Sequence, residues 1–304
     1  MARSYRYLQY DVFTDHLFGG NQLAVFLDGR GLSTATMQAI AKEMNFSETT
    51  FMLPPENAGT DVRMRIFTPA DELPMAGHPT IGSTFALART GVIDHRRERI
   101  VFGLGIGPVP VSLTWNDGEL GFAWMTQGAP EFGEPVTDGA AVAAALSVHP
   151  SAVAAATPVQ VVSCGVPFLF VPLTTRLAVD SASVSREAFG ALLQSMKPRP
   201  NGIFFFTPEP GADRATAYSR MFAPDLGIVE DPATGVASGP LGSYLLRHKI
   251  VDAETAAHMV SLQGVKMGRP SHVHIAIGVN GAGEIASVRV GGQAVLAGEG
   301  MLYV

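Results

Sequence analysis

The 304-residue sequence predicts an α+β protein made of two similar halves, each with a mostly antiparallel or mixed sheet. The main observation is a repeat: residues 63–69 read R-M-R-I-F-T-P, and residues 218–224 read Y-S-R-M-F-A-P. An arginine, a phenylalanine and a proline recur at one constant spacing, and a Gly-rich stretch follows each segment. Strand and helix patterns do not alternate along the chain, which argues against a Rossmann fold.

In the first half, residues 5–13 alternate between apolar and polar side chains, the pattern of a half-buried strand. A turn at Gly19, Gly20 and Asn21 separates it from a second apolar run at 23–27. The remaining strand patterns of this half are, in order, residues 49–53, 62–67, 99–102, 109–115 and 120–125.

Two helices are expected in the same half. Ser33 has the chemistry of an N-cap, and apolar residues recur at helical spacing between residues 37 and 44. Residues 79–89 begin with a proline in the first turn, and Gly91 stands just past their end. This second helix comes directly after the first Gly-rich stretch.

The second half repeats this order. Its expected helices cover residues 137–146, 185–193 and 236–248, and its expected strands cover residues 159–163, 168–172, 203–207, 216–222, 259–262, 273–278 and 287–290. The last apolar run, 294–304, is expected to return to the first half. The predicted domains are therefore residues 1–127, joined by 294–304, and residues 128–293.

The two Gly-rich helices have almost no charge on any side, so each is expected to be a core helix surrounded by sheet. The first N–H groups of each helix need partners, and Gly77 and Gly235 allow close backbone approach there. Two such helix starts, facing each other across a cleft between the halves, favour an anionic ligand such as a carboxylate.

The bulk composition excludes several classes of protein. A net charge of −6 argues against nucleic acid as the main partner, and no apolar run is long enough for a membrane span. The N-terminus has no continuous apolar stretch of the kind found in a signal peptide. Cys164 is the only cysteine, so no internal disulfide is possible, which suits a cytoplasmic location.

Three residues are candidates for acid–base chemistry. Glu48 lies in N-F-S-E-T-T-F, where apolar neighbours favour a carboxyl suited to proton transfer near neutral pH. His78 and Asp231 stand at matching points, just before or within the start of each Gly-rich helix. Taken singly, each also fits a structural reading, as a turn carboxylate or a helix cap. Their matching positions favour function.

The repeat is asymmetric at Glu48, because the corresponding region of the second half, 201–206, has no acidic residue. A racemase with two bases needs one base on each face of the reacting carbon. A lone glutamate fits chemistry in which one group removes a proton and returns it elsewhere.

Other features favour structural roles. Cys164 is expected to be a small buried residue at a strand end. The glycines of G-L-G-I-G at 103–107 lie between two strands and predict a hairpin turn. His272 and His274 share one strand face but have no acid or cysteine near them in sequence to complete a metal site.

Six segments together resemble the PhzF-like phenazine biosynthesis proteins, within the diaminopimelate epimerase-like fold. They read D-V-F with G-N (11–13 and 20–21), F-S-E-T-T-F (46–51), E-L-P-M-A-G-H-P-T (72–80), R-M-F-A-P (220–224), E-D-P-A-T-G (230–235) and G-V-K-M-G-R-P-S (264–271). The resemblance covers the whole chain.

This resemblance implies two domains, each with a curved sheet wrapped around a central helix, with the site in the cleft. It also implies a homodimer, no metal and no organic cofactor. In the phenazine enzyme the equivalent of Glu48 moves a proton on a dihydro-hydroxyanthranilate ring, assisted by the equivalents of His78 and Asp231. The substrate is expected to contact a set that comprises Asn21, Gly77, Gly235 and Val236.

The chain departs from the family pattern at a few points. Val236 stands where the phenazine enzyme has a serine, and Gln22 stands where a proline is usual. The paired cysteines of the epimerase are absent, with Ala76 and Pro232 near those points, so thiol-based epimerisation is not expected.

Three functions remain open at this point. The first is an isomerase that moves a proton on a small carboxylated substrate, cyclic or open-chain, by means of Glu48. The second, suggested by Val236, is a non-catalytic metabolite-binding protein on the same scaffold. The third is a lyase in which Glu48 removes a proton and water is lost.

Overall fold

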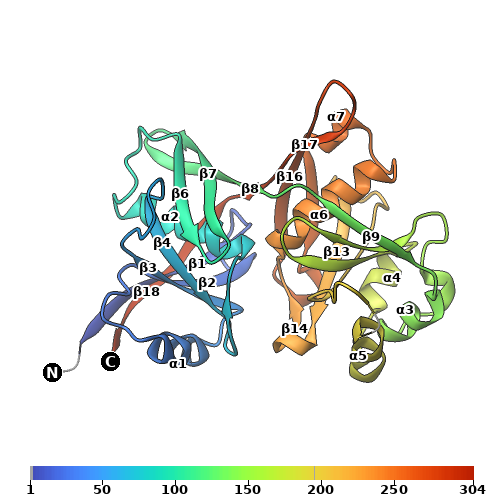
Figure 1. The fold of residues 1–304 in the computed structure, drawn as a ribbon, viewed down its shortest axis with the longest axis horizontal. Coiled ribbons are helices and arrows are strands. Elements are labelled where there is room, and N and C mark those ends of the chain that lie inside the picture. The colour runs from blue at the N-terminus through green and yellow to red at the C-terminus, as the bar shows by residue number, and fades with distance from the viewer. Residues whose placement is uncertain (1–2, 195) are drawn as a thin grey trace. The chain divides into compact units, whose positions relative to one another are not determined.

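The computed structural model describes residues 3–194 and 196–304 and divides into two compact units (Figure 1). Unit 1 comprises residues 1–126 and 290–304, and unit 2 comprises residues 127–289. In the described residues, no helix is both long and apolar enough to cross a membrane.

The elements of unit 1, in chain order, are β1 (Ser4–Val12), β2 (Asn21–Phe26), α1 (Thr34–Met44), β3 (Glu48–Leu53), β4 (Val62–Phe67), β5 (Glu72–Leu73), α2 (Gly77–Arg89), β6 (Arg99–Leu104), β7 (Gly107–Asn116), β8 (Glu119–Gln127) and β18 (Ala294–Tyr303). The elements of unit 2 are β9 (Glu131–Val136), α3 (Gly139–Ala145), η1 (Pro150–Ala152), β10 (Val159–Ser163), β11 (Pro167–Pro172), α4 (Arg176–Ser181), α5 (Arg186–Gln194), β12 (Ile203–Thr207), β13 (Ala217–Ala223), η2 (Pro224–Leu226), β14 (Ile228–Asp231), α6 (Gly235–Arg247), α7 (Ala253–Ala256), β15 (Met259–Gln263), η3 (Val265–Met267), β16 (Ser271–Val279) and β17 (Ile285–Gly292).

The two sheets have the same sequence of strand directions. In unit 1, β1, β2, β3, β4, β6 and β7 pair in that order as antiparallel, parallel, antiparallel, parallel and antiparallel neighbours. In unit 2, β10, β11, β12, β13, β15 and β16 repeat these directions step for step. The duplication predicted from two short segments therefore extends over the whole sheet, and the predicted α+β class with a mixed sheet is confirmed.

The C-terminal strand returns to the N-terminal one. Strand β18 pairs antiparallel with β1 from Ser4 opposite Tyr303 to Val12 opposite Ala294, as the adjacent red and blue ribbons show (Figure 1). In unit 2 the equivalent place beside β10 is taken by β9. An edge strand thus completes each sheet.

In unit 1 the sheet carries a helix on each face. Helix α1 is capped by Ser33, whose side chain accepts from the N–H of Thr36, and its apolar side packs on Phe26, Phe51 and Phe67. Helix α2 contacts β1, β2 and β3 and is buried from its first residue to Leu87. The apolar sequence of α2 therefore marks a helix enclosed by its own sheet, as predicted.

Unit 2 is built in the same way. Along β12, Ile203 and Phe205 face a core that includes α5, while Phe204 and Phe206 face the core around α6. Because both faces of β12 are buried, its sequence is continuously apolar rather than alternating. The glycine-rich turn predicted at 103–107 is also confirmed, since Leu104 pairs with Gly107 across a two-residue hairpin turn.

The structure adds elements that were not predicted. These are β5, β9, β14, α4, α7 and the 3-10 turns. Strand β9 contains Gly133 and Pro135, which favour loops, yet it pairs with β10 through an irregular register. The central helices also begin earlier than predicted, at Gly77 and Gly235.

Close packing of α2 gives a first testable prediction. A Cβ atom at Gly82 would lie 2.6 Å from Leu23 Cδ2 and 2.7 Å from Val12 Cγ2, which is too close for carbon atoms. Gly82→Ala is therefore expected to lower the free energy of unfolding by about 1–3 kcal/mol through overpacking. The matched control is Gly190→Ala in helix α5, where nothing lies within 4 Å of the added carbon.

The control is expected to raise stability by up to about 1 kcal/mol, because alanine has the higher helix propensity. Urea denaturation of both variants measures the two changes. A destabilised Gly190→Ala together with an unchanged Gly82→Ala would contradict the packing argument.

Candidate functional site

The polar residues predicted for unit 1 come together at one edge of its sheet. Strands β2 and β3 are parallel, with Leu23 opposite Glu48, so both strands start at this edge. Asn21 is the first residue of β2 and Glu48 is the first residue of β3. His78, the second residue of α2, reaches both of them.

The loop that leads into Asn21 is held by local contacts. Asp11 is almost fully buried, and its carboxylate accepts a hydrogen bond from the main-chain N–H of Phe18 at 2.8 Å. Gly20 has a φ of 61°, and a Cβ there would lie 2.3 Å from the carbonyl oxygen of Val12. These contacts give the D-V-F and G-N segments a structural role, because they fix the turn that places Asn21 at the start of β2.

Glu48 is placed by the end of α1. Asn45 ends that helix in the left-handed conformation, with a φ of 53°, and the chain enters β3 three residues later. The Glu48 residue is only 8 % exposed, so the alternative of a surface glutamate in a turn is wrong.

His78 joins the other two side chains. Its Nε2 lies 3.0 Å from Glu48 Oε2, and its Nδ1 lies 3.1 Å from the amide nitrogen of Asn21. Burial lowers the pKa of His78 to about 3, partly offset by a hydrogen bond with the backbone of Gln22. The ring is therefore neutral at physiological pH. A ring whose Nδ1 accepts from Asn21 carries its proton on Nε2, which faces the carboxyl group.

The lowered pKa of His78 predicts a pH-dependent stability. In the unfolded chain a histidine takes up a proton near pH 6.5, whereas His78 in the folded protein does so only near pH 3. The contribution of His78 to the free energy of unfolding is therefore fully present above pH 6.5. It is lost as the pH falls from 6.5 towards 3, by about 1.4 kcal/mol per pH unit. From pH 7 to pH 5 the loss is expected to be about 2 kcal/mol.

Chemical denaturation at pH 7 and at pH 5 tests this prediction. The His78→Gln variant is expected not to show the loss in the free energy of unfolding. His16→Gln, which removes a histidine whose side chain is 83 % exposed, is the control. Equal pH dependence in the wild type and in His78→Gln would contradict the assignment of a buried neutral imidazole.

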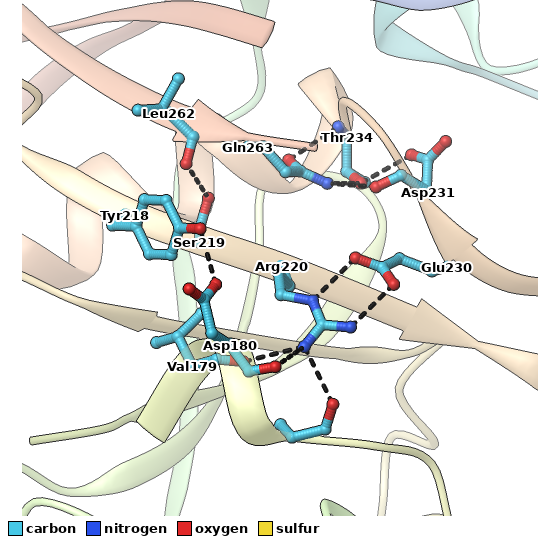
Figure 2. Close-up of polar contacts among 11 residues, drawn as sticks. Val179, Asp180, Tyr218, Ser219, Arg220, Glu230, Asp231, Thr234, Leu262 and Gln263 are labelled. Carbon is cyan, nitrogen blue, oxygen red and sulfur yellow. Dashed lines mark hydrogen bonds and ion pairs between the residues drawn. The ribbon is translucent and has the colours of Figure 1, made fainter. Parts of the chain in front are cut away.

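In unit 2, Asp231 is fixed by two neighbouring side chains (Figure 2). It is 5 % exposed, and the hydroxyl of Thr234 donates to its Oδ2 at 2.6 Å. The fully buried Gln263 donates through Nε2 to the main-chain oxygen of Asp231 at 2.8 Å and to Thr234 Oγ1 at 2.9 Å. The main-chain N–H of Thr234 donates back to Gln263 Oε1 at 3.0 Å.

These contacts explain the E-D-P-A-T-G segment. Thr234 is the N-cap residue of α6, but its hydroxyl donates to the Asp231 carboxylate and does not cap the helix. The N-cap residue of α2 makes no side-chain capping hydrogen bond either. Gly264 supports the same loop, since a Cβ there would lie 2.6 Å from the carbonyl oxygen of Pro232. Sequence reasoning gave no role to Thr234 or Gln263, and only their place in or beside the family segments could have marked them.

The remaining predicted contact residues lie at the helix starts. Gly77 and Gly235 are the first residues of α2 and α6, and Val236 is half-buried against the core of unit 2. The meeting of the two loops and the contacts of these residues with a substrate stay predictions.

The structure also bears on cysteine and metal chemistry. Cys164 is buried, as predicted, and burial raises the pKa of its thiol to about 12, which keeps it protonated and unreactive. Within residues 3–194 and 196–304, no three His, Cys, Asp or Glu side chains are grouped so that they could hold a metal ion.

Comparison with known proteins gives consistent matches over the full length. Residues 10–300 match the family described as phenazine biosynthesis-like protein (PhzC-PhzF). The chain is 36 % identical to an uncharacterized isomerase of Mesorhizobium japonicum, with 98 % of each chain covered. It is also 36 % identical to trans-2,3-dihydro-3-hydroxyanthranilate isomerase of Pseudomonas aeruginosa, over 99 % of this chain and 100 % of that one.

A solved structure agrees. The PhzF-family phenazine biosynthesis protein of Bacillus anthracis superposes with a TM-score of 0.87 at 26 % identity, covering 99 % of this chain and 100 % of the other. The resemblance inferred from six short segments is therefore confirmed.

Proposed function

Because the chain belongs to the phenazine biosynthesis-like protein family, we propose that it is an isomerase that moves a proton on a small carboxylated, cyclic substrate. The observation that carries the proposal is the buried contact between Glu48 and His78 at 3.0 Å, at the start of the central helix of unit 1. Relatives that share about a third of the sequence over its full length are isomerases by name.

In the proposed mechanism Glu48 is the acid and the base. Its carboxylate removes a proton from one carbon of the substrate and returns it to another carbon of the same ring, so that the product is an isomer of the substrate. No second base is required, which agrees with the absence of an acid at 201–206. Neutral His78 lies beside the carboxyl group, with Nε2 3.0 Å from Oε2 but not aligned for a hydrogen bond, and it can donate to the ionised carboxylate once the two side chains align on substrate binding.

The substrate carboxylate is proposed to bind at a helix start, where backbone N–H groups and the helix dipole favour an anion. Gly77 and Gly235, which have no side chain to block the approach of a ligand, are the first residues of these helices, and Asn21 borders the same region in unit 1. Asp231, held by Thr234 and Gln263, is proposed to assist the reaction. At Val236 an aliphatic side chain replaces the serine of the phenazine enzyme, so we propose a substrate that makes no hydroxyl contact there.

The test uses trans-2,3-dihydro-3-hydroxyanthranilate, the substrate in the name of the Pseudomonas aeruginosa relative, together with related cyclic acids. Each compound is incubated with the enzyme in D2O and followed by proton NMR and mass spectrometry. We expect a product of unchanged formula, apart from deuterium gained at the carbon that receives the proton.

Other results would separate the alternatives. A mass lower by one water indicates a lyase, and a thermal shift on binding with no change in any compound indicates a non-catalytic binding protein. Isomerisation at an equal rate by Glu48→Gln would overturn the proposed mechanism while leaving the reaction class intact.

A further inference from the structure

Unit 1 contains a cavity at the end of α2 that is remote from Glu48. Its volume is about 430 Å³, within the range of small-molecule sites. The wall is formed by α2, by β1 and β18, and by the hairpin between β7 and β8, and it includes Tyr10, Phe85, Arg89, Trp115 and Glu119.

The cavity is separate from the proposed catalytic residues. His78 is in the first turn of α2 and Arg89 is its last residue. Because a helix rises about 1.5 Å per residue, the 13 residues of α2 place these ends roughly 18 Å apart. A ligand of modest size in the cavity cannot reach Glu48.

Three aromatic side chains line the cavity, and one of them, Tyr10, has a hydroxyl group that can bind a ligand. Tyr10 is 3 % exposed, and its hydroxyl makes no hydrogen bond to any residue of 3–194 or 196–304. The phenol oxygen itself stays accessible at the cavity wall, so it can donate a hydrogen bond to a ligand there. Phe85 and Trp115 supply apolar ring faces, and the Trp115 indole N–H is already used on the carbonyl of Arg97.

Arg89 is the cation of the cavity lining and is available to bind an anion. Arg89 makes no ion pair with the described residues, although it lies near enough to Tyr10 to lower the pKa of that phenol against the larger effect of burial. Arg6, and to a smaller extent Arg89, lower the pKa of Glu299, whose carboxylate forms an ion pair with Arg6 at 2.6 Å. Glu119, the first residue of β8, is exposed and is the acidic residue of the lining.

We infer that this cavity is a second binding site, for a small aromatic carboxylate. The guanidinium of Arg89 pairs with the carboxylate in the bidentate manner available to arginine, and the hydroxyl of Tyr10 donates to the same group. The ring of the ligand lies against Phe85 and Trp115. The inference does not depend on the reaction that the enzyme catalyses.

Benzoate is the probe, and isothermal titration calorimetry is the readout, supported by the tryptophan fluorescence, which reports on Trp115 and Trp124 together. We expect saturable binding of benzoate and at least about tenfold weaker binding of neutral benzamide, because charged hydrogen bonds are the stronger ones. Arg89→Gln should weaken benzoate binding about tenfold or more, and Tyr10→Phe about threefold to tenfold. Arg99→Gln, which removes an exposed arginine outside the cavity, is the control and should leave binding unchanged.

Glu48→Gln separates this site from the proposed catalytic one and is expected to bind benzoate in the cavity as the wild type does. Loss of binding in Glu48→Gln with retention in Arg89→Gln would place the ligand at the catalytic carboxyl and overturn the inference. Absence of saturable binding, or equal binding of benzoate and benzamide, would also overturn it. If Arg89→Gln does not fold, Tyr10→Phe and the benzamide comparison still decide the outcome.

Discussion

Replacement of Glu48 by glutamine is expected to lower the turnover number by about 10³-fold or more, with little change in substrate binding. The amide has the size of the carboxyl group but cannot take up or return a proton at neutral pH. General acid–base groups contribute about 10²–10⁴-fold, and Glu48 is the one group proposed to carry the proton in both directions. The measurement is the steady-state rate with the substrate identified by the D2O experiment, with the turnover number and KM determined separately.

The matched control is Glu43→Gln, which makes the same exchange on an exposed position of α1 and should leave the rate unchanged. Asp231→Asn is expected to reduce the rate less than Glu48→Gln does, because Asp231 is proposed only to assist. Circular dichroism of each variant shows whether the fold is retained. A Glu48→Gln enzyme with wild-type turnover would require a different proton carrier.

The second large effect is expected on stability, from Arg220. In Figure 2 its guanidinium forms two hydrogen bonds with Glu230, both of 2.8 Å, and also donates to three main-chain carbonyl oxygens at the end of α4. The Arg220 side chain is 8 % exposed and that of Glu230 is 16 % exposed. Arg220→Met removes the cation and leaves a largely buried carboxylate and several carbonyl groups without their donor.

We expect Arg220→Met to lower the free energy of unfolding of unit 2 by about 3–5 kcal/mol, the range for breaking a buried ion pair. Arg65 offers a close control, because it is the repeat partner of Arg220 and binds Glu72 through two hydrogen bonds of 2.7 and 2.6 Å. The Arg65 side chain is 16 % exposed and that of Glu72 is 37 % exposed, and among the described residues Arg65 donates to no carbonyl group of a helix end.

Arg65→Met is therefore expected to destabilise the protein clearly less than Arg220→Met, and the double variant Arg220→Met with Glu230→Met should recover part of the loss. Urea denaturation followed by circular dichroism measures all three. Equal losses for Arg65→Met and Arg220→Met would show that the carbonyl contacts of Arg220 add nothing.

The repeat was readable from sequence because the same chemistry recurs at the same place. Arg65 and Arg220 each bind a glutamate shortly before a central helix, and each stacks on the phenylalanine two residues later, at 5.1 and 5.0 Å. A bidentate ion pair that stacks on an aromatic ring requires an arginine and a phenylalanine at a fixed spacing. The R-x-F pattern is therefore present in both halves. The uncharged central helices were readable for a similar reason, since burial on all sides leaves no place for a charge.

Other features could not be read in this way. The bond between Asn21 and His78 joins residues 57 positions apart, and nothing local in either segment specifies the partner. Helix α4 has only six residues, and its end is held by Arg220, 38 to 41 residues further along the chain. Strand β9 is formed by pairing with β10 against its own loop-forming residues.

The pairing of β18 with β1 has a consequence for how the protein is made. Residues 127–289 form one uninterrupted unit, whereas the sheet of the other unit lacks an edge partner for β1 until residues 294–303 leave the ribosome. At typical rates of translation the first strand waits on the order of 15 to 60 s for the last. The half that is synthesised second can therefore be complete before the half that is synthesised first, and during that interval the unpaired edge of β1 can pair with another chain unless a chaperone covers it.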